Sequence, residues 1–151
     1  APEGMNPQTH EREGVRTNHD QMTPYSSADC QKFMEFYEDL VGALQELFDF
    51  IRQCLQHYFP EEVVDLEMSI SQLPNHRGSA VHPFASIAIN FNVMTRLHRD
   101  VGDTTWCACM PLGSFLRGDL CLMEQGLVLP MRGGDLIFFR SRSDTHFNLP
   151  Y

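Results

Sequence analysis

Hydrophobic periodicity divides the chain into a helical part and a β-rich part. Apolar side chains recur at three- and four-residue spacing over residues 28–59, which predicts one long amphipathic helix. Pro60 is expected to end this helix, because proline lacks the amide hydrogen that a helix interior needs. Over residues 63–70 the apolar and polar positions partly alternate, and this pattern favours a strand.

Short apolar runs follow, separated by turns rich in Gly, Pro and Asp. The runs span residues 85–94, 104–110, 119–123, 127–129, 135–139 and 145–149. Many short strands with frequent turns are typical of a sandwich or a barrel. We therefore expect an α+β fold, mainly β, with the long helix packed on the sheets.

The N-terminal segment has a different composition. Residues 1–25 are polar, rich in Pro, Gly, Asn and Gln, and without periodicity, which predicts a flexible arm. The alternative is a strap that lies over the domain. The whole chain has 151 residues, a length that suits a single domain, here expected over residues 26–151.

The net charge of −9 is unevenly distributed. Residues 1–75 carry 4 basic and 14 acidic side chains, whereas residues 76–151 carry 7 basic and 6 acidic ones. This acidity argues against non-specific nucleic-acid binding, which needs Lys or Arg on the contact face. A local patch stays open, because every basic residue in the second half is an arginine, the side chain that binds phosphate and carboxylate in a two-pronged way.

Cysteine usage and hydropathy bear on the cellular setting. Five cysteines, an odd number, match no zinc spacing, and we interpret them as reduced thiols in an intracellular protein. The pattern shows no signal peptide or membrane span, so no membrane partner is expected.

Three residues form a candidate metal site. His98 and Asp100 share one face of an extended segment, because side chains of a strand repeat every two residues. His146 lies in a later predicted strand, after the turn at Gly133 and Gly134. Two histidines and one carboxylate form the facial triad of non-haem iron(II) oxygenases. The tripeptide alone is a weak signal, and a surface turn is the alternative.

Several stretches together resemble a known family. They are residues 89–92, 95–103, 118–122, 133–141 and 146–148. In these stretches the region from about 84 to 149 resembles the fungal members of the superfamily that contains the ten-eleven-translocation (TET) methylcytosine oxidases and the J-base thymine hydroxylases.

The resemblance implies a fold, a chemistry and a setting. The fold is a double-stranded β-helix (jelly-roll), and His98, Asp100 and His146 become ligands of Fe(II). The implied activity is 2-oxoglutarate-dependent hydroxylation, with dioxygen, of a methyl group on a nucleic-acid base such as 5-methylcytosine. DNA would then be the substrate and the nucleus the compartment.

For several other polar residues the sequence allows two possible roles. Asn90 and Asn92 would share the inner face of a strand, where Asn90 could bind the cosubstrate and Asn92 the substrate, or both could hydrogen-bond to a loop. Asp103 could position the substrate or hydrogen-bond into its own turn. Trp106 could stack on a flipped-out base, although a core position is the stronger expectation.

One departure from the family concerns 2-oxoglutarate. The family places a basic residue after the distal histidine to anchor the far carboxylate, but none of residues 147–151 is basic. We expect either a domain that lacks its last strand here or a substitute among Arg140 and Arg142, which could equally face solvent. The alternatives are the same chemistry on a protein or small molecule, and a truncated, transposon-like relative without activity.

Overall fold

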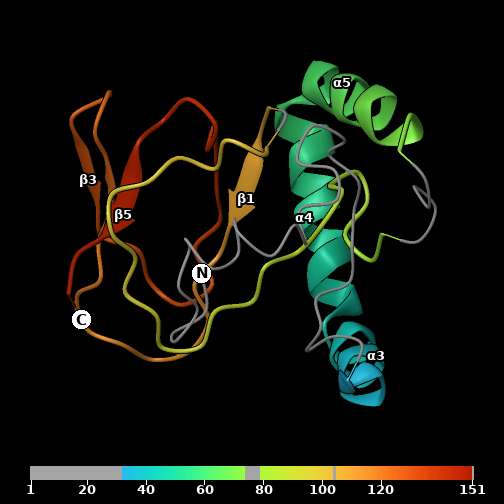
Figure 1. Ribbon diagram of the computed structural model, residues 1–151, viewed down its shortest axis with the longest axis horizontal. Coiled ribbons are helices and arrows are strands. Elements are labelled where there is room, and N and C mark those ends of the chain that lie inside the picture. The colour runs from blue at the N-terminus through green and yellow to red at the C-terminus, as the bar shows by residue number, and fades with distance from the viewer. Residues whose placement is uncertain (1–31, 74–78, 104, 151) are drawn as a thin grey trace, which may run out of the picture.

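The computed structural model describes residues 32–73, 79–103 and 105–150 (Figure 1). The elements are α3 (Met34–Ala43), α4 (Gln45–Tyr58), α5 (Pro60–Ser71), β1 (Cys107–Cys109), β2 (Leu120–Leu122), β3 (Leu127–Leu129), β4 (Ile137–Phe139) and β5 (His146–Asn148). Within these ranges, helices are too short or too polar to cross a membrane. The predicted arm at residues 1–25 lies outside the described residues.

From residue 32 to residue 73, the described helical part contains three helices rather than one long helix. α3 and α4 are separated at Leu44, and α5 follows α4 directly after Phe59. The strand expected over residues 63–70 is wrong, because α5 occupies this segment. Pro60 occupies the first helical turn of α5, where its missing amide hydrogen costs nothing.

The burial pattern of α5 explains the error. Val63, Leu66 and Ile70 are buried, at spacings of three and four residues that place them on one helical face. Glu61 and Glu62 occupy the first turn, where acidic side chains favour the helix dipole. Pro60 therefore follows the end of α4 and occupies the first turn of α5.

The strands form two small antiparallel sheets. β1 pairs with β4, and β2 lies between β3 and β5. These five strands fall inside five of the predicted runs, and the α+β class is confirmed. The expectation of a mainly β fold is wrong for the described residues, because their helices hold more residues than their three-residue strands. The run at residues 85–94 forms no strand, and Asn92 has a φ of 50°, outside the extended range. In the described part of the chain the sheets do not close into a barrel.

The core consists of two clusters joined through β4. Leu55, Val63 and Leu66 form the first, between α4 and α5, and Phe138 packs against it. Phe139 belongs to the second, with Leu120 and Leu122 of β2. Neighbouring strand residues face opposite sides, so β4 joins the helices to the three-stranded sheet. In Figure 1 the helices accordingly lie on one side of the strands.

Candidate metal centre

The two candidate histidines are brought together by backbone pairing. His98 N–H donates to the carbonyl of His146 at 3.1 Å, and His146 N–H donates to the carbonyl of His98 at 3.0 Å. The amide of Asp100 donates to the carbonyl of Ser141 at 3.0 Å. The segment that carries His98 and Asp100 thus runs beside the segment that leads into β5.

The three side chains converge in space. His98 Nε2 lies 3.7 Å from Asp100 Oδ1, and His146 Nε2 lies 3.6 Å from Asp100 Oδ2. One ligand atom from each residue lies within 4.8 Å of the others, and the group could hold a metal ion. Ligands about 2 Å from one ion lie roughly 3 Å apart, so small side-chain rotations would complete the site.

Both histidines use their other ring nitrogen in the same way. His98 Nδ1 lies 2.7 Å from the carbonyl oxygen of Arg96, and His146 Nδ1 lies 2.9 Å from the carbonyl oxygen of Asp144. A carbonyl can only accept, so each Nδ1 carries a proton, and Nε2 is the ring nitrogen left to bind a metal. Metal-binding histidines are commonly oriented by this kind of bond.

The electrostatics and the exposure of the group suit a cation. Two Nε2 lone pairs and a carboxylate face one another, and a cation between them would satisfy all three. His146 is buried, at 7% exposure, and its ring packs edge-on against Phe139. The side chains of His98 and Asp100 are 38% and 41% exposed, so the group is closed on one side and open to solvent on the other.

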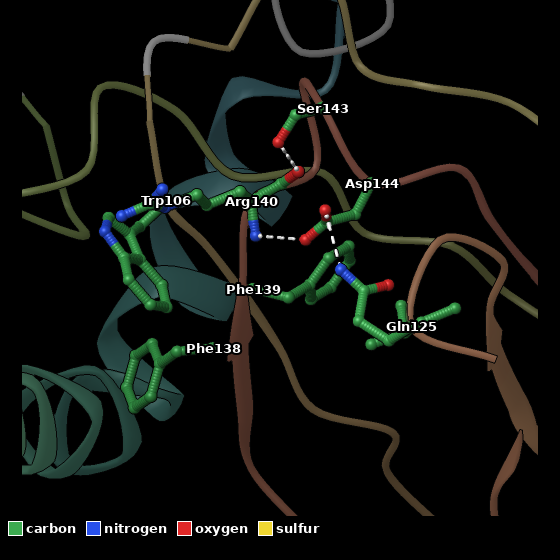
Figure 2. A pocket seen from close by; sticks show the side chains of 8 residues that line it. Trp106, Gln125, Phe138, Phe139, Arg140, Ser143 and Asp144 are labelled. Atoms are coloured by element: carbon green, nitrogen blue, oxygen red, sulfur yellow. Dashed lines mark hydrogen bonds between the residues drawn. The ribbon is translucent and has the colours of Figure 1, made fainter. Parts of the chain in front are cut away.

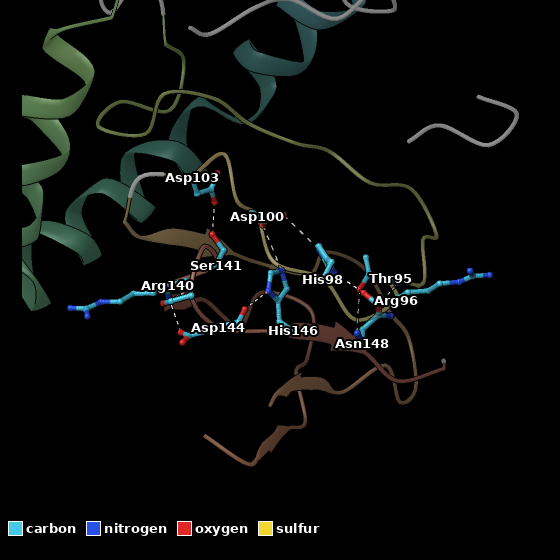
Figure 3. Close-up of polar contacts among 11 residues, drawn as sticks. Thr95, Arg96, His98, Asp100, Asp103, Arg140, Ser141, Asp144, His146 and Asn148 are labelled. Carbon is cyan, nitrogen blue, oxygen red and sulfur yellow. Dashed lines mark hydrogen bonds and ion pairs between the residues drawn. The ribbon is translucent and has the colours of Figure 1, made fainter. Parts of the chain in front are cut away.

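Asp103 supports the turn that carries Asp100. Its amide donates to the Asp100 carbonyl at 2.8 Å, and its carboxylate accepts a hydrogen bond from the Ser141 hydroxyl (Figure 3). Arg142 Nη1 donates to the Asp103 carbonyl at 3.1 Å. The backbone of Asp103 thus closes the turn, whereas its carboxylate bonds to the buried Ser141 and not to a group of its own turn.

The expected cosubstrate residues are not gathered around the three ligands. Asn90 and Asn92 are exposed, in a segment without strand pairing. Arg140 points away from the histidines in Figure 3. Its Nη2 lies 3.9 Å from Glu62 Oε1, and its guanidinium lies over the ring of Trp106. The structure therefore brings together His98, Asp100 and His146 but not the predicted anchors.

A network around Glu124, which the sequence interpretation missed, flanks the site. Glu124 Oε1 accepts from Arg99 Nη2 and from Thr145 Oγ1, each at 2.6 Å, and Oε2 accepts from the Thr145 amide at 2.6 Å. Hydrogen bonds from Thr145 and Arg99 lower the pKa of Glu124 to about 2. The signal in the sequence is that Arg99 separates two ligands and Thr145 precedes the third.

A second link lies on the other side of the histidine pair. The Thr95 amide and hydroxyl donate to Asn148 Oδ1 at 2.6 and 2.8 Å, and the Asn148 amide donates back to Thr95 Oγ1 at 3.3 Å. Both residues fall inside the stretches that carry the family resemblance. They join the approach to His98 to the end of β5.

A surface hollow of about 370 Å³ is bordered by residues that contact His146. Figure 2 shows the side chains that line it. Phe139 and Asp144 line it, but none of the three candidate ligands does. Trp106 also lines it, and its ring is contacted by Phe59 at 5.0 Å between centroids and by Arg140. Trp106 is thus half-buried at the hollow and packed against Phe59, and it belongs to neither of the two core clusters.

Comparison of the chain with protein-family models, with curated proteins and with solved structures found no match. The case for a function therefore depends on the geometry of the site and on the motifs in the sequence.

Proposed function

We propose that this chain is an iron(II)- and 2-oxoglutarate-dependent dioxygenase that hydroxylates a methyl group on a nucleic-acid base. The observation that carries the proposal is the convergence of His98, Asp100 and His146, with both Nδ1 atoms held by carbonyls and both Nε2 atoms facing the Asp100 carboxylate. The double-stranded β-helix belongs to the same proposal. Two antiparallel sheets joined through β4 are compatible with part of such a fold.

The donor set fits ferrous iron. Two imidazole nitrogens and one carboxylate oxygen, without sulfur, form the facial set that leaves positions open for other ligands. The nearby thiol of Cys107 is a poor competitor for the metal, because burial raises its pKa to about 12 and a metal binds the thiolate. When bound, ferrous iron and 2-oxoglutarate supply the electrons that allow dioxygen to hydroxylate a C–H bond.

The residues of the chain would orient and shield this chemistry. The backbone bonds of His98 and His146 fix the spacing of two ligands, and their Nδ1 bonds fix the orientation of both rings. Phe139 and the buried position of His146 exclude water from one side. The exposed edges of His98 and Asp100 leave the other side for cosubstrate and substrate.

The fit to 2-oxoglutarate is incomplete in the described residues. Arg96 and Arg140 point away from the three ligands in Figure 3, Arg99 binds Glu124, and Arg142 binds the carbonyl of Asp103. The two arginines that Figure 3 labels are thus not aimed at the site to hold the far carboxylate, and the other two have other partners. Support for this cosubstrate comes from the sequence resemblance.

The same observation favours a second candidate, a metal-binding relative without oxygenase activity. Oxygenase chemistry on a protein or small molecule is a third, because the net charge of −9 does not favour a nucleic-acid substrate. The proposed base substrate would have to leave the DNA stack to reach the metal.

Two successive measurements separate these candidates. Fe(II) is titrated anaerobically, and succinate release from 2-oxoglutarate is then measured in air with and without methylated duplex DNA. Metal binding with succinate release and oxidised base supports the proposal. Metal binding without succinate release supports the metal-binding relative without oxygenase activity. Succinate release that DNA does not stimulate, with no oxidised base formed, supports oxygenase chemistry on another substrate.

A further inference from the structure

The Glu124 network (Arg99, Glu124 and Thr145) joins the two segments that carry the candidate ligands. Arg99 stands between His98 and Asp100, and Thr145 immediately precedes His146. Glu124 lies in the turn between β2 and β3, so its carboxylate reaches both segments from a third element.

The network is cross-linked rather than a single ion pair. Besides their bonds to Glu124, Arg99 and Thr145 bond to each other, because Arg99 Nε donates to Thr145 Oγ1 at 2.8 Å. The Thr145 carbonyl accepts from the Met123 amide at 2.9 Å, which ties the same turn to the ligand segment through the backbone. Isolated surface pairs contribute little, whereas charge-assisted bonds to a shared carboxylate fix a geometry.

The Glu124 network affects the metal site because it lies next to the pairing of His98 with His146. The pairing of His98 with His146 is one isolated bridge, not a ladder of strand bonds. Its position therefore depends on the flanking links. These are the Glu124 network and the Asp100–Ser141 backbone bond on one side, and the Thr95–Asn148 contacts on the other. Loss of the carboxylate would let the two ligand segments move relative to each other.

We propose that Glu124 is a positioning residue for the metal centre, acting through Arg99 and Thr145 to hold His98, Asp100 and His146 at ligand spacing. This inference depends on the proposed metal-binding function. Groups that orient metal ligands typically change metal affinity by about 10- to 100-fold when they are removed. The network lies farther out than a direct hydrogen-bond partner, so we expect the low end of that range.

The test uses Co(II), whose visible spectrum reports coordination geometry, titrated into the full chain and its variants. Glu124→Gln keeps the side-chain shape but removes the charge, and Glu124→Ala removes the bonds of the carboxylate to Arg99 and Thr145. Thr145→Val removes the hydroxyl, and Thr145→Ser restores it. Asp49→Asn is the matched control, because Asp49 forms an exposed ion pair with Arg52 in α4, at 3.2 Å.

The inference predicts about 10-fold weaker Co(II) binding and an altered spectrum for Glu124→Gln and Thr145→Val. It predicts wild-type behaviour for Thr145→Ser and Asp49→Asn. Wild-type affinity and spectrum in both Glu124→Gln and Thr145→Val would overturn the positioning role while leaving the metal centre intact. A wild-type chain that binds no Co(II) would overturn the metal centre itself, and the inference with it.

Discussion

His98 and His146 exchange both of their backbone hydrogen bonds, at 3.1 and 3.0 Å, and their rings lie 4.2 Å apart between centroids. Each ring also has its Nδ1 held by a carbonyl. Backbone pairing thus fixes where the two side chains begin, and the ring hydrogen bonds fix where they point. Asp100 completes the group from the adjoining turn.

The glycine turn before β4 is closely packed against another loop. A Cβ atom at Gly133 would lie 2.2 Å from the backbone oxygen of Gly113, so Gly133→Ala must displace one of the two loops. We expect a loss of about 1–3 kcal/mol in the free energy of unfolding, measured by urea denaturation. Gly42→Ala is the control, because its Cβ meets nothing within 4 Å in α3 and alanine favours a helix. Equal stability of the two variants would show that the loops do not approach as described.

The interface between α4 and α5 depends on Leu55. This side chain is fully buried and packs with Val63 and Leu66. Leu55→Ala is expected to reduce the free energy of unfolding by about 2–5 kcal/mol, because truncation removes apolar contacts and leaves a cavity. Met68→Ala on the exposed side of α5 should change it by less than about 0.5 kcal/mol. Similar losses in the two variants would contradict the packing of α5 on α4.

The thiol of Cys107 should be unreactive in the folded protein. Burial raises its pKa to about 12 from 9.0, with smaller contributions from Cys109, Asp103 and Asp100. At pH 8 the folded thiol therefore stays protonated, whereas the unfolded chain holds an appreciable thiolate fraction. We expect alkylation of Cys107 by iodoacetamide, followed by peptide mass spectrometry, to be slow until urea unfolds the chain. Equally fast labelling without urea would show that the β1 region is open.

The sequence predicts the positions of the strands better than those of the helices. Gly and Pro punctuate residues 104–149 so closely that each run could form only a short element. By contrast, Pro60 has two opposite meanings, the end of one helix or the first turn of the next, and periodicity over so short a segment did not separate helix from strand. The exposure of Asn90 and Asn92 depends on strand pairing, which a single sequence does not specify.

The three candidate ligands could be predicted from the sequence motif, but the residues that support them could not. His98 and Asp100 followed from two-residue spacing, and His146 from the strand after the glycine turn. Glu124 and Thr145 were not found, because their contacts join segments that are distant in sequence and their residue types are common. Arg140 was predicted as an anchor from its place in the sequence, but its side chain points to Trp106 and Glu62.

The most direct test of the metal centre is an anaerobic Fe(II) titration of the wild-type chain beside His98→Ala, Asp100→Ala and His146→Ala. His57→Ala serves as the control, because His57 lies on α4 next to Tyr58 and outside the candidate group. We predict one bound Fe(II) in the wild type and in His57→Ala. Each ligand variant should bind at least about 100-fold more weakly, beyond what loss of an orienting group alone costs. Unchanged affinity in all three ligand variants, with the fold intact, would contradict the metal site.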